Sequence, residues 1–331
     1  MRLLIATDAC RPQVNGVVQT YERLTEQLVR WGHEVAFISP DGFRTVPLPT
    51  YPEIRLALIT PGHARRRITA FRPDHIHIAT EGPVGLATRA DCVSRRQPFT
   101  TSYHTRFPEY LTARLPLVPE SWGYAFERWF HNAGAGIMVS TQSLLGELAG
   151  KGLKHLMPWT RGVDTELFRP RDARIFGREP VFLYVGRVSI EKNLNAFLDL
   201  ALPGRKVIVG GGPQLTALKA AYPDATFTGP LFDETLAQAY ASSDVFVFPS
   251  RTDTYGVVLL EALASGVPIA AFPVTGPIDV VVHGQVGHLG EDLRQAALAA
   301  LTMDRAACRD YALGFSWETC ARQFIDNVNS A

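Results

Sequence analysis

The sequence lacks any apolar run of about 18 residues, the length that a membrane-spanning helix requires. Any contact with a membrane is therefore expected to be peripheral. The N-terminal stretch Arg2–Thr7 is too short to be the hydrophobic region of a signal peptide. Cysteine is scarce, without a C-x-x-C pair or metal-like spacing, which predicts reduced cytosolic thiols instead of a disulfide framework. The four cysteines are Cys10, Cys92, Cys308 and Cys320.

Two ligand-binding motifs are also missing. Neither of the loops that open the two halves of the chain reads G-x-G-x-x-G, which argues against a dinucleotide-dependent dehydrogenase. The chain contains no Asp-x-Asp pair, the usual carboxylate clamp for a metal-bound nucleotide diphosphate. This absence favours a metal-independent reaction, and we expect neither a metal ion nor a cofactor.

The composition is that of a soluble globular protein, with 46% hydrophobic and 20% charged residues among 331. The net charge is +1, but it is unevenly distributed. Residues 1–165 carry 19 Lys and Arg against 14 Asp and Glu, and residues 166–331 carry 14 against 18. The basic first half would suit a position near an anionic surface. The length is sufficient for two α/β domains, each with its own core.

Both halves begin with a short apolar strand, a loop and an amphipathic helix. In the first half the strand covers Leu3–Thr7 and the helix Val17–Trp31; in the second half the strand covers Val181–Val185 and a helix lies near Leu194–Leu200. Strands that alternate with helices predict parallel sheets joined by right-handed crossovers. We therefore expect an α/β fold with two doubly wound, Rossmann-like parallel-sheet domains.

The expected domains are residues 1–165 and residues 166–315, and a C-terminal helix in residues 316–331 is expected to return to the first domain. The boundary is placed in a stretch rich in Arg, Pro and Asp, near Gly162–Pro180. Ligands of such folds bind beyond the carboxyl ends of strands. The first loop of each domain is therefore expected to face a shared cleft.

The segment Pro249–Gly266 is the most informative part of the sequence. A strand pattern precedes it and a helix is predicted over Gly256–Ala264, so that Gly256 lies where free backbone N–H groups and the helix dipole bind phosphate. Asp253 then stands just outside the helix N-terminus, and Glu261 about a turn and a half inside it. This layout suits the sugar, pyrophosphate and ribose of a nucleotide sugar. The alternative is an ordinary loop and helix with two solvated carboxylates.

Three residues in the first loops of the two domains are further candidates. Gly16 precedes a predicted helix N-terminus, where a glycine lets the backbone approach a phosphate or sugar closely. Arg187 and Lys192 follow the first strand of the second domain, where cations can neutralise a pyrophosphate leaving group. The alternatives are a simple turn at the glycine and solvated surface charge at the two cations.

Three histidines are also informative. His104 ends an extended run and could bond a sugar hydroxyl, although a satisfied core polar group is the commoner role of such a residue. His75 and His77 alternate along a predicted strand and share one face. No third ligand has matching spacing, so packing is favoured over a metal site for this pair.

Taken together, these residues resemble the retaining glycosyltransferases of family 4, which have the two-domain GT-B fold. The resemblance covers nearly the whole chain. Its six motifs are the donor-facing glycine loop, the PDhhHhxTEGPhG segment, the His-Thr motif, the domain junction, the phosphate-binding segment and the acidic E-x7-E motif. In this sequence they occur, in the family's order, at Asp8–Gly16, Pro73–Gly85, Tyr103–Phe107, Arg161–Phe168, Val185–Leu194 and Asp253–Glu261.

The resemblance implies that residues 1–165 bind the acceptor and residues 166–315 bind the nucleotide-sugar donor. Gly16, Arg187 and Lys192 would contact the donor pyrophosphate. The remaining phosphate contacts would come from backbone N–H groups of Tyr255, Gly256, Val257 and Val258.

The resemblance also assigns the sugar contacts. Glu261 would hold the ribose hydroxyls, Asp253 the hydroxyls of the transferred sugar, and His104 the sugar near its reacting carbon. Arg187, Lys192, Asp253 and His104 are thus the candidate catalytic residues. The chain departs from the family pattern in one position, because Asp253 replaces the first glutamate, which leaves the identity of the sugar open. The implied reaction retains the anomeric configuration without an enzymic nucleophile.

The acceptor is predicted from basic and apolar residues that lie close together in the first half. They occur in Arg65–Arg72, at Arg95–Arg96 and in Arg106–Leu115. Such surfaces suit anionic headgroups, and the opening Thr7–Val18 resembles the branch with diacylglycerol glycosyltransferases, mannosyltransferases and sulfoquinovosyltransferases. We therefore expect a hexose from a UDP- or GDP-sugar to be transferred to a lipid acceptor such as diacylglycerol. The protein would lie peripherally on the cytoplasmic face of the membrane, with no nucleic-acid partner.

Three other functions stay open at this point. A soluble glycosyltransferase would act on a polysaccharide or small metabolite without binding vesicles. A nucleotide-sugar epimerase or hydrolase on the same fold would consume the donor without an acceptor. A non-enzymatic nucleotide-sugar binder is disfavoured, because Arg187, Lys192 and Glu261 are all present.

Overall fold

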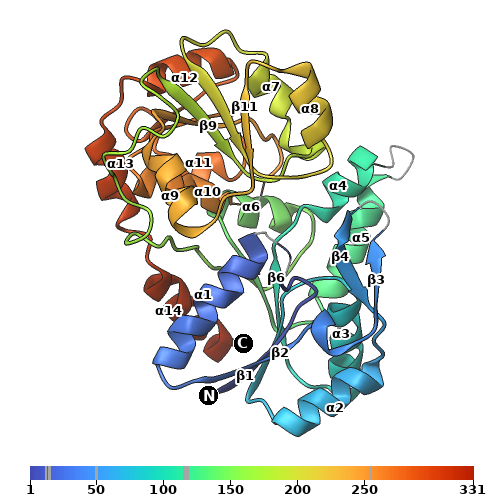
Figure 1. Ribbon diagram of the computed structural model, residues 1–331. Coiled ribbons are helices and arrows are strands. Elements are labelled where there is room, and N and C mark those ends of the chain that lie inside the picture. The colour runs from blue at the N-terminus through green and yellow to red at the C-terminus, as the bar shows by residue number, and fades with distance from the viewer. Residues whose placement is uncertain (12, 14–15, 49–50, 115–118, 254) are drawn as a thin grey trace. The chain divides into compact units, whose positions relative to one another are not determined.

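The computed structural model describes the chain in six segments: residues 1–11, 13, 16–48, 51–114, 119–253 and 255–331. These residues form two compact units (Figure 1). Unit 1 comprises Met1–Thr160 together with Trp317–Ala331, and unit 2 comprises Arg161–Ser316. The first division lies five residues before the boundary expected from the sequence, and the second lies one residue after it. Unit 1 therefore contains both ends of the chain.

Unit 1 is built around a six-stranded parallel sheet in the order β2-β1-β5-β6-β7-β8. Its strands are β1 (Arg2–Ala6), β2 (Glu34–Ile38), β5 (His75–Ile78), β6 (Thr100–Tyr103), β7 (Gly136–Val139) and β8 (Leu156–Pro158). A separate antiparallel pair is formed by β3 (Thr45–Leu48) and β4 (Tyr51–Ala57). The helices are α1 (Gly16–Arg30), η1 (Pro40–Gly42), α2 (Pro61–Phe71), α3 (Pro83–Arg95), α4 (Phe107–Arg114), α5 (Glu120–His131), α6 (Gln142–Gly150) and α14 (Trp317–Ser330).

The alternation of side chains along β1 gives unit 1 two cores. Leu3 and Ile5 pack with the apolar faces of α1 and α14, whereas Leu4 and Ala6 pack with α2 and α3. Figure 1 shows α1 and α14 side by side. Helix α14 is the last of the chain, yet it completes the cover on one face of the sheet that β1 begins.

Unit 2 contains a second parallel sheet, in the order β11-β10-β9-β12-β13-β14. Its strands are β9 (Val181–Val185), β10 (Arg205–Val209), β11 (Thr226–Gly229), β12 (Val245–Phe248), β13 (Ile269–Ala271) and β14 (Gly287–Leu289). Its helices are η2 (Ile190–Lys192), α7 (Leu194–Leu198), α8 (Leu215–Ala221), α9 (Asp233–Ala241), α10 (Val257–Ala264), α11 (Pro277–Val280), α12 (Leu293–Ala300) and α13 (Arg305–Ala312).

The candidate site of unit 2 follows strands β9 and β12, which lie side by side in the sheet. All five residues of β9 are buried, alternately against the helices of one face and those of the other. Because the carboxyl ends of parallel strands lie at one edge, the loop after Val185 and the loop after Phe248 meet there. The predicted fold, two parallel-sheet α/β domains, is confirmed.

No helix in the six described segments combines the length and the apolar content needed to cross a membrane.

Candidate active site

Two of the predicted donor-binding residues are in direct contact in unit 2. The Lys192 ammonium donates a hydrogen bond to Asp253 Oδ2 at 2.7 Å, and the two side chains are only 20% and 16% exposed. Lys192 ends η2 after β9, and Asp253 follows β12. Asn193 joins the same loops, because its Nδ2 donates to the Pro249 carbonyl at 3.1 Å. A cation and a carboxylate are thus held together, the one suited to phosphate oxygens and the other to hydroxyl groups.

Arg187 follows a glycine turn that packs tightly against the next loop. Gly186 has φ +153°, and a Cβ on Gly210 would lie 1.9 Å from the Gly186 carbonyl oxygen. Only glycine allows the loops after β9 and β10 to approach so closely. The Tyr184 hydroxyl donates to the Arg187 carbonyl at 2.9 Å, which fixes the backbone from which the half-buried Arg187 side chain extends. The Gly210 turn was outside the sequence-based prediction of the site.

Gly256 is the N-cap of α10, as the sequence predicted, and it has φ +80°. Its carbonyl accepts the first helical bond from Leu259 N–H at 2.9 Å. Val257 and Val258 open the helix and are half-buried, whereas Tyr255 is buried. The first N–H groups of α10 have no carbonyl partner one turn earlier in the helix, so this end favours an anion.

Glu261 lies inside α10 and is only 4% exposed. Its Oε2 accepts a hydrogen bond from the buried Tyr240 hydroxyl at 2.8 Å. Burial and the neighbouring carboxylate of Glu261 raise the pKa of Tyr240 well above its usual value, so that the phenol stays a donor. Because Glu261 is buried and Asp253 is mostly buried, the alternative of two solvated carboxylates does not describe this segment. Tyr240 was not predicted, since its position in a helix pattern indicates only a core residue.

His104 belongs to a polar network within unit 1. Its Nε2 lies 3.0 Å from the Tyr21 hydroxyl, which is also 2.8 Å from His77 Nε2 and 3.1 Å from Ser102 Oγ. The rings of Tyr21 and His104 meet edge to face, with centroids 5.5 Å apart. The half-buried His104 is thereby held at the carboxyl end of β6 by a hydroxyl from α1. The sequence placed Tyr21 only in the apolar stripe of its helix, and its hydroxyl bond could not be foreseen from that spacing.

His75 and His77 on β5 both contact a residue of the neighbouring strand β6. His75 Nε2 and His77 Nδ1 lie 2.9 Å and 2.8 Å from the same hydroxyl, that of Thr100. Burial lowers the pKa of His75 to about 4, so this ring is neutral at physiological pH. Both rings therefore have a bonding partner between strands, in line with the packing role.

Gly16 begins α1 and is exposed. A Cβ at this position would meet no atom within 4 Å, so the fold of the protein itself does not require glycine there. Pro12 and residues 14–15, which complete the predicted glycine loop, lie outside the described residues.

The Thr80–Gly85 motif forms a cap for α3 around Asp8. Asp8 Oδ1 accepts from Val84 N–H at 2.9 Å, and Asp8 Oδ2 accepts from the Thr80 hydroxyl at 2.9 Å. Burial raises the pKa of the Asp8 carboxyl group, although the hydrogen bonds from Val84 and Thr80 act to lower it. A Cβ on Gly82 would lie 2.4 Å from Asp8 Cγ, and a Cβ on Gly85 would lie 1.8 Å from the Thr80 carbonyl oxygen. Both glycines are thus required by packing.

Another residue of that motif, Glu81, belongs to a buried cluster with Glu127 and His131. His131 Nε2 lies 3.2 Å from Glu81 Oε1 and 3.0 Å from Glu127 Oε2, while its Nδ1 lies 2.8 Å from Thr101 Oγ1. The three ligand atoms lie within 4.8 Å of one another, a spacing that one cation could bridge. A protonated imidazole bridges the two carboxylates equally well. Burial would lower the pKa of His131, but the two carboxylates outweigh it and raise that pKa to about 9.

The arginines of the predicted basic segment Arg65–Arg67 differ in their contacts. Arg65 Nε donates to Asp91 Oδ1 at 2.7 Å, and Asp91 also pairs with Arg95 at 3.4 Å. Two of the predicted surface cations therefore share one buried carboxylate, which offsets one of their two positive charges. Arg66 and Arg67 form no ion pair among the residues that the structure describes.

Comparisons with known proteins give the family. Residues 14–167 match the model described as Glycosyltransferase Family 4, and residues 179–304 match that described as Glycosyl transferases group 1. The GDP-mannose-dependent alpha-mannosyltransferase of Mycobacterium tuberculosis (strain CDC 1551 / Oshkosh) is 31% identical over 366 residues, which cover 100% of this chain and 97% of the relative. Sulfoquinovosyl transferase SQD2 of Arabidopsis thaliana is 32% identical over 83% of this chain and 56% of its own length.

A solved structure shows the same fold. Sucrose-phosphate synthase from Thermosynechococcus elongatus matches 99% of this chain and 98% of its own chain with a TM-score of 0.81 at 20% identity. The motifs, the two parallel-sheet units and the matches along the sequence agree with one another. The chain therefore belongs to the family 4, group 1 glycosyltransferases and has their GT-B fold.

Proposed function

We propose that the protein transfers a hexose from a nucleotide diphosphate sugar to a lipid acceptor such as diacylglycerol, with retention of the anomeric configuration. The observation that carries this proposal is the 2.7 Å contact between Lys192 and Asp253 at the carboxyl edge of the second sheet, in a chain of this family. Lys192 would bind the pyrophosphate and Asp253 the hydroxyls of the sugar. Glu261, which lies eight residues after Asp253 and within α10, would bind the ribose.

GDP-mannose is the first donor to test. The relative that matches over 97% of its own length is named as dependent on GDP-mannose. Asp253 in place of the family's first glutamate shortens the carboxylate that would receive the sugar hydroxyls. The same experiment must therefore include other hexoses on both GDP and UDP.

The chemistry would need no enzymic nucleophile. The acceptor oxygen forms a bond to the anomeric carbon on the face from which the leaving group departs, while the bond from that carbon to the phosphate oxygen breaks. The electron pair stays on the nucleoside diphosphate, and one of its phosphate oxygens takes the acceptor proton. Arg187 and Lys192 would stabilise the developing negative charge, and His104 would bond the transferred sugar. These cations and the N-terminus of α10 would take the place of a metal ion.

A lipid acceptor is supported by the charge of residues 1–165. Residues 1–165 carry 19 basic against 14 acidic residues, and exposed arginines lie on α2. Such a surface attracts anionic membranes at about 1 kcal/mol per cation. We therefore propose peripheral binding to the cytoplasmic face of the membrane.

The test is transfer from radiolabelled GDP-mannose, GDP-glucose, UDP-glucose and UDP-galactose to vesicles with and without diacylglycerol, followed by NMR of the product linkage. Three results together support every part of the proposal. The product partitions into the organic phase, it keeps the α-linkage of the donor, and it forms equally well in the presence of EDTA. Lys192→Met should abolish transfer, and Arg322→Gln, at an exposed ion pair with Glu318, should not.

Other outcomes would replace the proposal. Label transferred only to a water-soluble acceptor would indicate a soluble transferase. Donor consumption that gives free sugar or an epimer, with no acceptor required, would indicate a hydrolase or epimerase. An inverted linkage would exclude retention, and inhibition by EDTA would exclude metal independence.

A further inference from the structure

The hydroxyl group of Tyr21 lies at the centre of the polar network in unit 1. Its oxygen is 3.0 Å from His104 Nε2, 2.8 Å from His77 Nε2 and 3.1 Å from Ser102 Oγ. Tyr21 belongs to α1, His77 to β5 and Ser102 to β6, and His104 directly follows β6. One side chain of a helix therefore bonds to residues of two neighbouring strands, and one of these residues is the candidate for the sugar contact.

The packing of α1 does not require this hydroxyl group. Tyr21 is 3% exposed, and its ring lies in the same core as Leu24 and Leu28 of the helix. A phenylalanine would fill the same space. A buried hydroxyl group costs free energy unless it has hydrogen-bond partners. The bonds to the two histidines are thus the property that distinguishes a tyrosine from a phenylalanine at this position.

Aromatic contacts add to the restraint on His104. The Trp159 ring centroid lies 5.8 Å from that of Tyr21 and 5.9 Å from that of His104. The rings of Tyr21 and His104 also meet each other edge to face. Ring contacts and a bond at Nε2 together restrict the rotation of the imidazole. Because Nε2 is directed at Tyr21, Nδ1 is the nitrogen through which His104 would bond a ligand.

The bond at Nε2 also restricts where the ring proton lies. A phenol donates one proton and can also accept a hydrogen bond. If Tyr21 donates to Nε2, a neutral His104 carries its proton on Nδ1, and if Tyr21 accepts, Nδ1 is an acceptor. Without the phenol, both tautomers are open to the ring. A sugar hydroxyl can donate or accept, so that a single tautomer of His104 selects one orientation of that hydroxyl.

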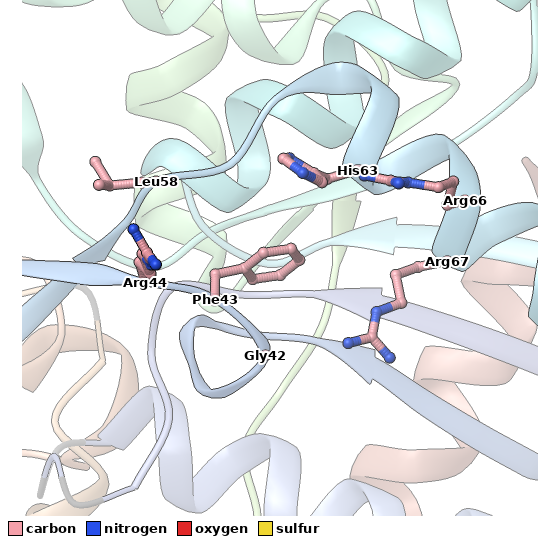
Figure 2. Close-up of a pocket in the computed structure, with 7 residues that line it drawn as sticks. All are labelled: Gly42, Phe43, Arg44, Leu58, His63, Arg66 and Arg67. Carbon is pink, nitrogen blue, oxygen red and sulfur yellow. The ribbon is translucent and has the colours of Figure 1, made fainter.

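The network is separate from a pocket of about 520 Å³ in the same unit (Figure 2). The segment after η1, the residue after β4 and the helix α2 line this pocket, whereas Tyr21 and His104 lie on α1 and at the end of β6. Variants of the network therefore change a different part of unit 1. The lining residues are Gly42, Phe43, Arg44, Leu58, His63, Arg66 and Arg67.

We propose that Tyr21 is a positioning residue of the transfer reaction. Its hydroxyl group fixes the His104 ring in one orientation and one tautomer, so that Nδ1 meets a hydroxyl of the transferred sugar. The inference rests on the proposed function, in which His104 bonds that sugar. It also gives α1 a second role, because this helix begins at Gly16, the proposed pyrophosphate contact, and Tyr21 follows five residues later. The helix that begins at the phosphate therefore also orients the group that bonds the sugar.

The first test needs neither donor nor acceptor. Long-range proton–nitrogen NMR correlation on the full chain, with the His104 signals assigned from His104→Asn, reports the protonation of both ring nitrogens. The wild type should show a single tautomer. Tyr21→Phe keeps the aromatic ring and should show an average of the two tautomers. Ser102→Ala is the matched control, since Ser102 bonds Tyr21 and His77 in the same network, and it should keep the single tautomer.

Three results of this NMR test would overturn the proposal. They are an average of both tautomers in the wild type, His104 signals that do not respond to Tyr21→Phe, and an equal response to Tyr21→Phe and Ser102→Ala. The last result would mean that any disturbance of the network has the same effect as the loss of the phenol.

The second test separates the sugar from the nucleotide. Calorimetry measures the binding of GDP-mannose and GDP, or of the donor that the transfer assay selects and its nucleotide. Tyr21→Phe should weaken the binding of the nucleotide sugar about 5- to 10-fold and leave the nucleotide within about 2-fold, because only the sugar contacts His104. In a His104→Asn background the same substitution should cause no further loss, since its effect passes through His104.

Equal losses for nucleotide sugar and nucleotide would overturn the proposal, because Tyr21 would then act through the general structure of unit 1. Additive losses in the double variant would overturn it as well. Unchanged nucleotide binding also shows that Tyr21→Phe is folded.

In the transfer assay, Tyr21→Phe should lower kcat roughly 10- to 100-fold, because a slightly misplaced group loses most of its effect on the reaction. Ser102→Ala should keep kcat within about 3-fold of the wild type, since the bond between Tyr21 and His104 stays in place. An unchanged kcat in Tyr21→Phe would overturn the role in transfer. If no acceptor gives a product, the proposed function fails, and the NMR and binding results still decide whether Tyr21 positions His104.

Discussion

At the scale of single residues, the candidate site depends on contacts between positions far apart in sequence. Lys192 and Asp253 are 61 residues apart and bond directly because β9 and β12 are neighbours. The sequence predicts each residue from its own motif. It does not predict their contact, since spacing along the chain does not give the order of strands. Tyr21 and Tyr240 were missed for a related reason: a tyrosine at helical spacing indicates core packing, and only the fold shows which polar group its hydroxyl meets.

Glu261 provides the residue-scale prediction. Glu261→Gln should weaken the binding of GDP or UDP about 10-fold to 100-fold, because the ribose diol would lose a charged acceptor. Tyr240→Phe is the matched control, since it removes the other partner of the same 2.8 Å bond but leaves the carboxylate. It should lower the melting temperature and leave nucleotide affinity within about 3-fold. Calorimetric titration of GDP and UDP into both variants measures these affinities. Comparable losses of affinity would mean that Glu261 acts through the structure of α10 and not on the ligand.

At the scale of elements, the sequence predicts where several helices begin, but it does not predict the strand pair β3 and β4. Strand and helix positions in the core follow the apolar pattern, and α1, α7 and α10 begin within one residue of the expected positions. The pair β3 and β4 was not foreseen. Pro47 and Pro52 lie within these strands, and proline usually argues against a strand because it cannot donate to the ladder. Among the described residues, β3 and β4 pair only with each other, so each is an edge strand, and an edge strand can contain proline.

Gly82→Ala tests the cap of α3. The new Cβ would lie 2.4 Å from the Asp8 carboxyl carbon, so the variant should lose about 2 kcal/mol of unfolding free energy or more. In an Asp8→Ala background the same substitution should cost much less, because the atoms that it strikes are gone. Gly146→Ala in α6 is the control, since a Cβ there meets nothing within 4 Å and alanine favours a helix. Urea unfolding measures all four variants. An equal cost of Gly82→Ala in both backgrounds would refute the steric account.

The cluster of Glu81, Glu127 and His131 ties α5 to the loop before α3 and predicts a pH dependence. The pKa of His131 is raised to about 9, and burial raises the pKa of Glu127 to about 7. Both groups therefore bind protons more tightly in the folded chain than in the unfolded chain. The contribution of His131 is fully present below its unfolded pKa of about 6.5 and is lost as the pH rises through 9. The contribution of Glu127 is lost earlier, as the pH rises through 7. Stability should thus fall with rising pH.

We expect the free energy of unfolding to drop by about 1 to 3 kcal/mol between pH 6.5 and pH 9.5. His131→Gln should be less stable than the wild type at pH 6.5 and should keep only the smaller pH dependence that comes from Glu127. Urea titrations at five pH values give the slope for each protein. The same slope in wild type and His131→Gln would show that other groups cause the pH dependence. If ZnCl₂ stabilises the wild type but not His131→Gln, the cluster binds a cation in place of the proton.

At the scale of the whole molecule, the chain begins and ends in unit 1. Residues Trp317–Ala331 follow the whole of unit 2 in sequence, yet they group with Met1–Thr160. The return of this helix to the first domain was expected, but its amphipathic pattern alone names no partner. The structure supplies the partner: Phe324 packs beside Trp159, with ring centroids 5.1 Å apart, and also beside His77. The core that carries the His104 network thus includes the last helix of the chain.

This arrangement makes the C-terminus a determinant of unit 1 stability. Phe324 is fully buried in the core shared by β1, α1 and α14. Phe324→Ala should therefore cost about 3 to 5 kcal/mol and lower the urea midpoint of unit 1. Asn329→Ala, at an exposed position of the same helix, should change stability by less than about 0.5 kcal/mol. Because unit 2 has its own sheet and cores, GDP or UDP should still bind to Phe324→Ala when unit 1 begins to unfold. Simultaneous loss of nucleotide binding and of unit 1 would show instead that the two units unfold as one.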